Sequence, residues 1–171
     1  MENLFYLLAT SFVLRISGYK KFKNYLIGDT GCSVLLSSGT GTFDFSQTSS
    51  GDKLYFNEFC DNNVHYGIIC IELIDDYDID EAESLLQNYV SKLKKPFVIM
   101  HHTGFESAID WNTRNSRAFV DYWQDAGQND WKVKGYTNGK IMAILYVQNI
   151  NKLDVKMQDQ FLDSFHFSPA C

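Results

Sequence analysis

Proline and long apolar runs are both scarce in this sequence. Only 2 prolines occur among 171 residues, whereas phenylalanine and tyrosine number 13 and 10. Aromatic side chains pack well on pleated surfaces, so this composition favours extended strands in a closely packed sheet. The apolar stretch at residues 4–14 is shorter than the about 20 residues that a membrane-spanning helix requires. We therefore expect a globular protein without a transmembrane span.

The sequence also lacks the short motifs that mark common active sites. It has no Gly-x-Ser-x-Gly elbow, no phosphate loop with Lys-Ser/Thr and no dinucleotide fingerprint. The 4 cysteines are widely spaced and form no Cys-x-x-Cys pair, so neither a zinc knuckle nor a redox motif is indicated. Cys70, inside the run "YGIICIEL", is interpreted as a small buried hydrophobic residue. We expect no enzymatic activity, no cofactor and no metal site.

Positive charge is in deficit. The chain carries 15 Lys and Arg against 21 Asp and Glu, a formal net charge of −6, and its pI is about 5.1. An acidic protein gains nothing from neutralising phosphates, so we expect no binding to nucleic acid. A short basic patch, Lys20, Lys21 and Lys23, could face an anionic surface or a lipid headgroup. We favour a solvated face instead, with Phe22 and Tyr25 turned inward.

The chain divides into an N-terminal segment, residues 1–30, and a single α/β sandwich domain, residues 31–171. The segment holds the apolar stretch and the basic patch. The apolar stretch has the length of a signal-peptide core, but Glu2 stands where such signals carry basic residues, and "LRIS" is a poor cleavage site. The alternatives are an atypical export signal and a buried N-terminal helix or strand. We favour the buried element, and a cytoplasmic location over export.

The central part of the domain predicts strands followed by a helix. Residues 31–37 look like a first core strand, and residues 53–59 and 64–74 predict an antiparallel pair around the turn "DNN". The second arm stays apolar for most of its length, so it is expected at the centre of a sheet. In residues 78–95 apolar side chains recur at helical spacing, with acids in the first turn and lysines in the last. We expect a helix there, closed by Pro96.

The last third of the chain predicts more strands and a final helix. Residues 96–106 begin as a strand, and residues 116–127 alternate between polar and apolar side chains. Asn138-Gly139 supplies the positive φ values of a tight hairpin turn between two further strands. From Leu153 apolar residues recur every four positions, which predicts a helix packed on the sheet. The order of elements predicts an α+β fold: a mostly antiparallel twisted β-sheet flanked by helices.

Three of these features together resemble a known superfamily. They are the hairpin "LYFNEF…VHYGIICIEL" followed by a long helix, the hairpin "WKVKGYTNGKIMAILYV", and a terminal helix that runs into "FLDSFHF". The combination, over residues 30–167, is similar to the PsbP-like and Mog-type α/β/α sandwich superfamily. The sequence departs from the usual pattern where Leu36-Ser37-Ser38 stands in place of a proline that closes the first strand.

The resemblance implies a binding protein without catalytic activity. Members bind photosystem subunits in one branch, a small GTPase in another, and secretion effectors in bacteria. The matching motifs occupy core and turn positions, so they identify no binding residue. Our first hypothesis is a non-enzymatic protein-binding or chaperone-like adaptor module of bacterial type. It would act on an unknown protein partner and exist as a monomer or weak dimer.

Aromatic residues suggest where a partner could bind. Trp111, Tyr122, Trp123 and Trp131 gather in the last third of the chain. Tyr122 and Trp123 are neighbours on a predicted strand, so their side chains must face opposite sides of the sheet. One of the two is therefore expected to lie away from the core, where exposed aromatic rings anchor partners. We predict the partner-binding face at these four residues.

A second hypothesis is a small enzyme or ligand-binding domain with a pocket near His101, His102 and Trp111. Consecutive histidines on a strand point to opposite faces, so they could not share a metal ion unless the strand bends there. Cys60 and His65 flank the first predicted turn and could be neighbours. A reactive thiolate needs a lowered pKa, however, and the adjacent Asp61 acts in the opposite direction.

Overall fold

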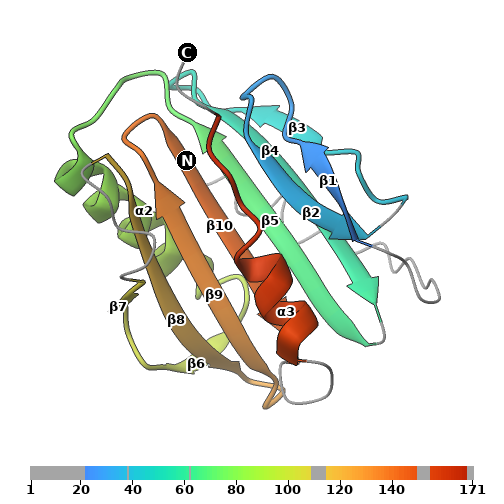
Figure 1. Cartoon of the computed structure of the whole chain (residues 1–171). Helices are drawn as coiled ribbons and strands as arrows, with labels where there is room; N and C mark the ends of the chain where they lie inside the picture. The colour runs from blue at the N-terminus through green and yellow to red at the C-terminus, as the bar shows by residue number, and fades with distance from the viewer. Residues whose placement is uncertain (1–21, 38, 62, 109–114, 150–154, 169–171) are drawn as a thin grey trace.

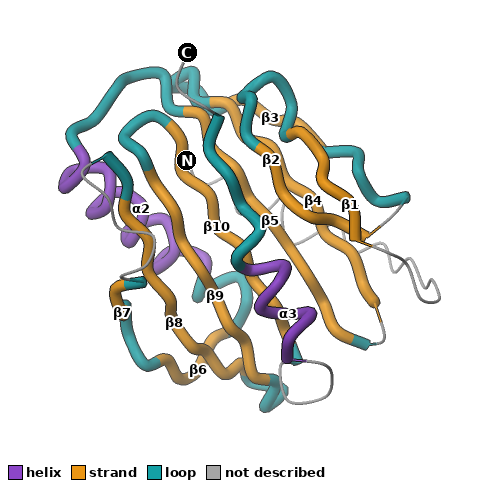
Figure 2. Tube along the Cα trace, viewed as in Figure 1, coloured by secondary structure: helices purple, strands orange, loops and turns teal. Residues whose placement is uncertain are grey.

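A computed structural model of the chain describes residues 22–37, 39–61, 63–108, 115–149 and 155–168. Within these residues it contains ten strands and two helices, whose arrangement is drawn in Figure 1 and Figure 2. The strands are β1 Phe22–Leu26, β2 Ser33–Ser37, β3 Asp44–Gln47, β4 Lys53–Asp61, β5 Val64–Glu72, β6 Ile99–His102, β7 Glu106–Ser107, β8 Arg117–Asp125, β9 Asp130–Thr137 and β10 Ile141–Gln148. The helices are α2 Ile79–Leu93 and α3 Val155–Leu162. The apolar stretch 4–14, Lys20, Lys21, Trp111 and Leu153 lie outside the described residues.

The main sheet is antiparallel and has the order β3-β4-β5-β10-β9-β8-β6, with β7 also paired to β8. Strands β4 and β5 form the predicted first hairpin, and β9 and β10 form the predicted second one. The two hairpins meet where β5 pairs with β10, so that Cys70 lies opposite Ala143. Both central strands are buried along nearly their whole length, as the apolar pattern of residues 64–74 predicts.

Helix α2 covers one face of the sheet. Its N-terminus is capped by Asp78, whose carboxylate accepts hydrogen bonds from the backbone N–H groups of Asp80 and Glu81 at 3.0 and 2.9 Å. The apolar side of the helix packs on β8, β9 and β10, behind the sheet in Figure 1. The helix predicted at residues 78–95 is confirmed.

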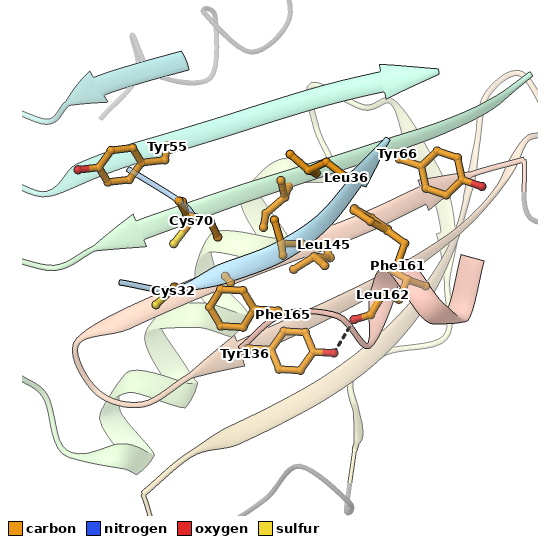
Figure 3. Packing of buried hydrophobic residues seen from close by; sticks show 14 of the residues in the cluster. Cys32, Leu36, Tyr55, Tyr66, Cys70, Tyr136, Leu145, Phe161, Leu162 and Phe165 are labelled. Carbon is orange, nitrogen blue, oxygen red and sulfur yellow. Dashed lines mark hydrogen bonds between the residues drawn. The ribbon is translucent and has the colours of Figure 1, made fainter. Parts of the chain in front are cut away.

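The opposite face is covered by the β1–β2 hairpin together with α3 (Figure 1). Figure 3 shows Phe161, Leu162 and Phe165 packed into the core of this face, where the Tyr136 hydroxyl donates a 2.6 Å hydrogen bond to the Leu162 carbonyl. Ser164 ties this segment to β2, because its hydroxyl accepts a hydrogen bond from the Leu35 N–H at 3.0 Å.

The predicted α/β/α sandwich, a sheet flanked by helices, is wrong. The described part of the chain is rich in β-structure, and only one face of the sheet is covered by a helix of substantial length. On the other face a two-stranded antiparallel hairpin does most of the covering, and α3 has only 8 residues. Residues 31–37, expected as a core strand, belong to this hairpin, so they pack on the main sheet without joining it. No helix among the described residues is long and apolar enough to cross a membrane.

The turn between β9 and β10 forms at Asn138-Gly139 as predicted. Gly139 has a φ of 91°, and a Cβ at this position would collide with the Tyr77 carbonyl oxygen. The Asn138 side chain accepts hydrogen bonds from the backbone N–H groups of Lys140 and Ile141 at 3.1 and 2.8 Å. This turn therefore holds the two strands in register over the length that carries the candidate site.

Candidate functional site

Tyr122 and Trp123 face opposite sides of β8, as their adjacency requires. Trp123 is only 3% exposed, and Trp131 only 6%, because both pack in the core on the α2 face. Tyr122 lies on the other face and is 36% exposed. Of the three described residues predicted to bind a partner, only Tyr122 therefore presents its ring at the surface. Trp111 lies outside the described residues.

His101 and His102 lie on β6, at the edge of the main sheet, and both are exposed. They stand opposite Gln124 and Trp123, which are consecutive residues of β8 and so face opposite sides. Among the described residues no group of three or more His, Cys, Asp or Glu side chains could hold a metal ion. Neither His101 nor His102 lines the pocket on the α2 face of the sheet, so this pocket is not the one that the sequence suggests.

A pocket of about 210 Å³ opens on the α2 face beside the end of this helix. We call it the Glu58 pocket. It is formed by strands β4, β5, β8, β9 and β10 and by the turn that follows α2. The lining residues are Glu58, His65, Tyr66, Pro96, Phe97, Asp125, Trp131, Tyr146 and Gln148.

One row of cross-strand neighbours builds the floor of the pocket. Glu58 on β4 stands opposite Gly67 on β5, and Gly67 stands opposite Tyr146 on β10. The Tyr146 ring lies over Gly67, where a Cβ would overlap ring atoms. Tyr146 thereby reaches across one strand, and its hydroxyl donates a hydrogen bond to Oε1 of Glu58. Without glycine at position 67 this pair could not form in the same geometry.

Aromatic rings form the apolar wall. The ring centroid of Phe97 lies 4.9 Å from that of Trp131 and 5.2 Å from that of Tyr146, and the centroids of Trp131 and Tyr146 are 5.8 Å apart. Phe97 comes from the turn after α2, while the other two rings stand on β9 and β10. The wall is thus assembled from one turn and two strands.

The turn that carries Phe97 contains a strained residue. Val98 has a φ of 53°, a left-handed conformation that β-branched residues rarely adopt. The surrounding backbone holds it there: the Val98 N–H donates to the Lys95 carbonyl at 3.1 Å, and the Val98 carbonyl accepts from the Ala126 N–H at 3.0 Å. This strain is located one residue from the pocket wall, as is common at functional sites.

Asp125 is held rigidly at the other side of the pocket. Its Oδ2 accepts hydrogen bonds from Trp131 Nε1 and Gln148 Nε2, both at 2.9 Å, and its Oδ1 accepts one from the Asn129 N–H at 3.0 Å. Burial by itself would raise the pKa of Asp125, but the hydrogen bonds from Asn129, Trp131 and Gln148 together lower it. The carboxyl group is therefore ionised at neutral pH.

The pKa values of Glu58 and His65 are shifted mainly by burial, which removes water from both side chains. Glu58 as a residue is exposed, yet its carboxyl end lies among protein groups, and this burial raises its pKa against the opposing effect of the Tyr146 hydrogen bond. Burial lowers the pKa of His65, which keeps its imidazole neutral at neutral pH.

His65 also stands opposite Cys60, as predicted. Burial, then Glu58 and Asp61, raise the pKa of the Cys60 thiol, so this cysteine is not an activated nucleophile.

The sequence patterns do not identify this pocket. Glu58 lies four residues after Leu54 on β4 and so faces the same side of the strand, but nothing in the sequence joins it with Tyr146. The only local indication is Gly67, a glycine inside an otherwise apolar strand, which is typical of a place where another group approaches closely. Finding the partner of Gly67 requires the register between β5 and β10.

Comparison with known proteins leaves the family open. No protein-family model matches the chain, and no curated protein matches it significantly. The resemblance to PsbP-like and Mog-type proteins therefore stays a prediction.

Proposed function

We propose that this chain is a non-enzymatic binding domain and that the Glu58 pocket is its recognition site. The observation that carries the proposal is the convergence of polar groups from four strands on one small cavity with an aromatic wall. Glu58, His65, Asp125 and Gln148 all line it. Pockets that combine apolar walls with a few converging polar groups are the usual form of binding sites.

The chemistry of the lining groups supports binding rather than covalent catalysis. The Cys60 thiol, beside the pocket, has a raised pKa and stays protonated. Asp125 is engaged by donors from three residues, so it is suited to hold its neighbours in place. Glu58 is oriented by Tyr146. Such an arrangement offers a fixed set of hydrogen-bonding groups to a ligand.

The size of the pocket limits what can enter. A volume of about 210 Å³ corresponds to roughly seven molecules of liquid water. It accommodates one amino-acid side chain or a molecule of similar size. A protein partner would therefore insert a single side chain, which reconciles the predicted protein-binding module with the predicted ligand-binding domain.

Nuclear magnetic resonance tests the proposal with three probes that share a four-carbon chain: n-butylammonium, 1-butanol and butyrate. The reporter is the indole N–H peak of Trp131, which lines the pocket, in ¹⁵N-labelled protein. Trp123 is the internal control, because its indole N–H donates to Asp121 at 2.7 Å, outside the pocket. The variants Trp123→Phe and Trp131→Phe assign the two peaks.

We expect at least one probe to shift the Trp131 peak in a saturable manner over the millimolar range, with a smaller effect on Trp123. If none of the three probes does so, the Glu58 pocket is not a binding site and the proposed function is refuted.

A further inference from the structure

We infer that the Glu58 pocket binds a cationic group, an alkylammonium whose charge meets Glu58 and whose aliphatic stem packs on the aromatic wall. This inference rests on the proposed binding function and adds the chemical class of the ligand. It follows from the charge of the pocket, from its hydrogen-bonding groups and from its apolar surface.

The lining carries negative charge without a counter-ion. Glu58 and Asp125 contribute carboxyl groups, and none of the lining residues is Lys or Arg. Of the two lysines that directly follow α2, Lys94 is bound to Asp121 at 3.0 Å, four residues before Asp125 on β8, and Lys95 is exposed and does not line the pocket. An anionic ligand would meet two carboxyl groups here, whereas a cation would neutralise them.

Glu58 has an acceptor position available for a ligand. Tyr146 donates to Oε1, and within the described part of the chain no donor is hydrogen-bonded to Oε2. The carboxyl group has lost part of its hydration through burial, so a bound ammonium would replace the missing water with a charge-assisted hydrogen bond. His65 does not compete for this role, because its neutral ring brings no positive charge.

The aromatic wall suits the rest of such a ligand. Phe97, Trp131 and Tyr146 present rings from three different elements. The faces of aromatic rings attract cations within about 6 Å and also pack against methylene groups. The protein already pairs a lysine with aromatic rings nearby, since Lys94 Nζ lies 5.1 Å from the Phe105 ring centroid and 5.7 Å from that of Trp123.

The three probes decide between a cation and its alternatives. We expect n-butylammonium to bind at least about tenfold more tightly than 1-butanol, because only the cation forms a charge-assisted hydrogen bond with Glu58. Butyrate should not shift the Trp131 peak. Binding of 1-butanol or butyrate as tight as that of n-butylammonium would overturn the inference while leaving a binding pocket in place. The absence of binding by all three probes refutes the proposed function instead.

Glu58→Gln tests the residue that carries the inference. Glutamine keeps an oxygen that can accept the Tyr146 hydrogen bond but removes the charge, so n-butylammonium binding should weaken about tenfold or more. The matched control is Glu81→Gln, which removes the same charge from an exposed position in the first turn of α2 and should leave the affinity unchanged. Equal affinities in wild type and Glu58→Gln, with both proteins giving folded spectra, would contradict the inference.

A further arm distinguishes a free amine from a lysine side chain of a protein. The probes are the pentapeptide Gly-Gly-Lys-Gly-Gly with blocked ends and the same peptide with norleucine in place of lysine. Lysine-dependent binding at least as tight as that of n-butylammonium supports a protein partner that inserts one lysine. Binding of n-butylammonium alone supports a free small amine. Both results retain the cation site, and tighter binding of the norleucine peptide would overturn it.

Discussion

The ion pair between Lys94 and Asp121 joins the end of α2 to strand β8, and Lys94→Met would break it. The Asp121 side chain is completely buried, while that of Lys94 is 15% exposed, and the two groups are 3.0 Å apart. In the variant Asp121 keeps its hydrogen bonds from Trp123 Nε1 at 2.7 Å and from the Gly104 N–H at 3.0 Å, but it loses its positively charged partner. Breaking a buried pair by removing one member typically costs 3–5 kcal/mol. Because neutral donors remain, we expect a loss of about 3 kcal/mol.

Urea denaturation at pH 7, followed by tryptophan fluorescence, measures this loss. Methionine is an unbranched apolar residue that fills much of the space of the lysine stem, so the measured change reports the missing charge, including its contacts with the Phe105 and Trp123 rings. Lys95→Met is the matched control at an exposed neighbouring position, where we expect a change within about 0.5 kcal/mol. A loss below about 1 kcal/mol for Lys94→Met, as small as many surface pairs give, would refute the argument that this pair is buried and structurally required.

Three further predictions concern the pocket. Val98→Gly should raise the free energy of unfolding by up to about 1 kcal/mol in the same urea assay. Glycine relieves the left-handed strain at φ 53°, and this gain is partly offset by the greater entropy of glycine in the unfolded state. A decrease in the free energy of unfolding would contradict this prediction. Gly67→Ala should destabilise by about 1–3 kcal/mol, because a Cβ overlaps the Tyr146 ring, and it should abolish n-butylammonium binding by displacing Tyr146 from Glu58. Burial raises the pKa of Glu58 above the ordinary 4.5, so the folded state binds this proton more tightly than the unfolded state. The contribution of this proton to folding stability is present below pH 4.5 and is lost as the pH rises through the raised pKa. Glu58→Gln should therefore become more stable relative to wild type as the pH rises across that range. A stability difference that does not change with pH would contradict the raised pKa of Glu58.

Elements specified by neighbouring residues could be predicted from the sequence. Helix α2 has its cap at Asp78, its apolar spacing and its charge asymmetry within one segment, and the structure places it at Ile79–Leu93. The turn at Asn138-Gly139 likewise depends on backbone preferences of two residues. Such features need no knowledge of the rest of the fold, which is why they are confirmed.

The covering of the second face could not be predicted in the same way. The pattern of residues 31–37 is that of a half-buried strand, and such a strand looks alike in a central sheet and in a hairpin packed on one. Which of the two forms depends on pairing with β1 across the turn that contains Gly28 and Gly31, and on how this hairpin packs against the main sheet. The resemblance supplied helices for both faces, and in this chain a β-hairpin occupies most of one of them.

The aromatic residues show the limit of the same reasoning at the site. Alternation along β8 correctly separates Tyr122 from Trp123 but does not say which of them is covered. Trp123 lies on the face that α2 and the following turn cover, and its burial leaves Tyr122 as the surface residue. A strand pattern therefore identifies the two faces, whereas exposure depends on the packing of distant elements.

The position of the pocket follows from how α2 ends. The helix covers parts of β8, β9 and β10 and ends at Leu93. It does not extend over Glu58 and Tyr146, which line the pocket. Beyond that point only the turn with Pro96 and Phe97 reaches over the sheet, and Val98 adopts its strained conformation where this turn joins β6. A turn has fewer side chains to fill the space than another helical turn would. Polar residues on the α2 face therefore surround an opening at this end of the sheet. The end of α2 thus creates the space in which we propose that a ligand binds.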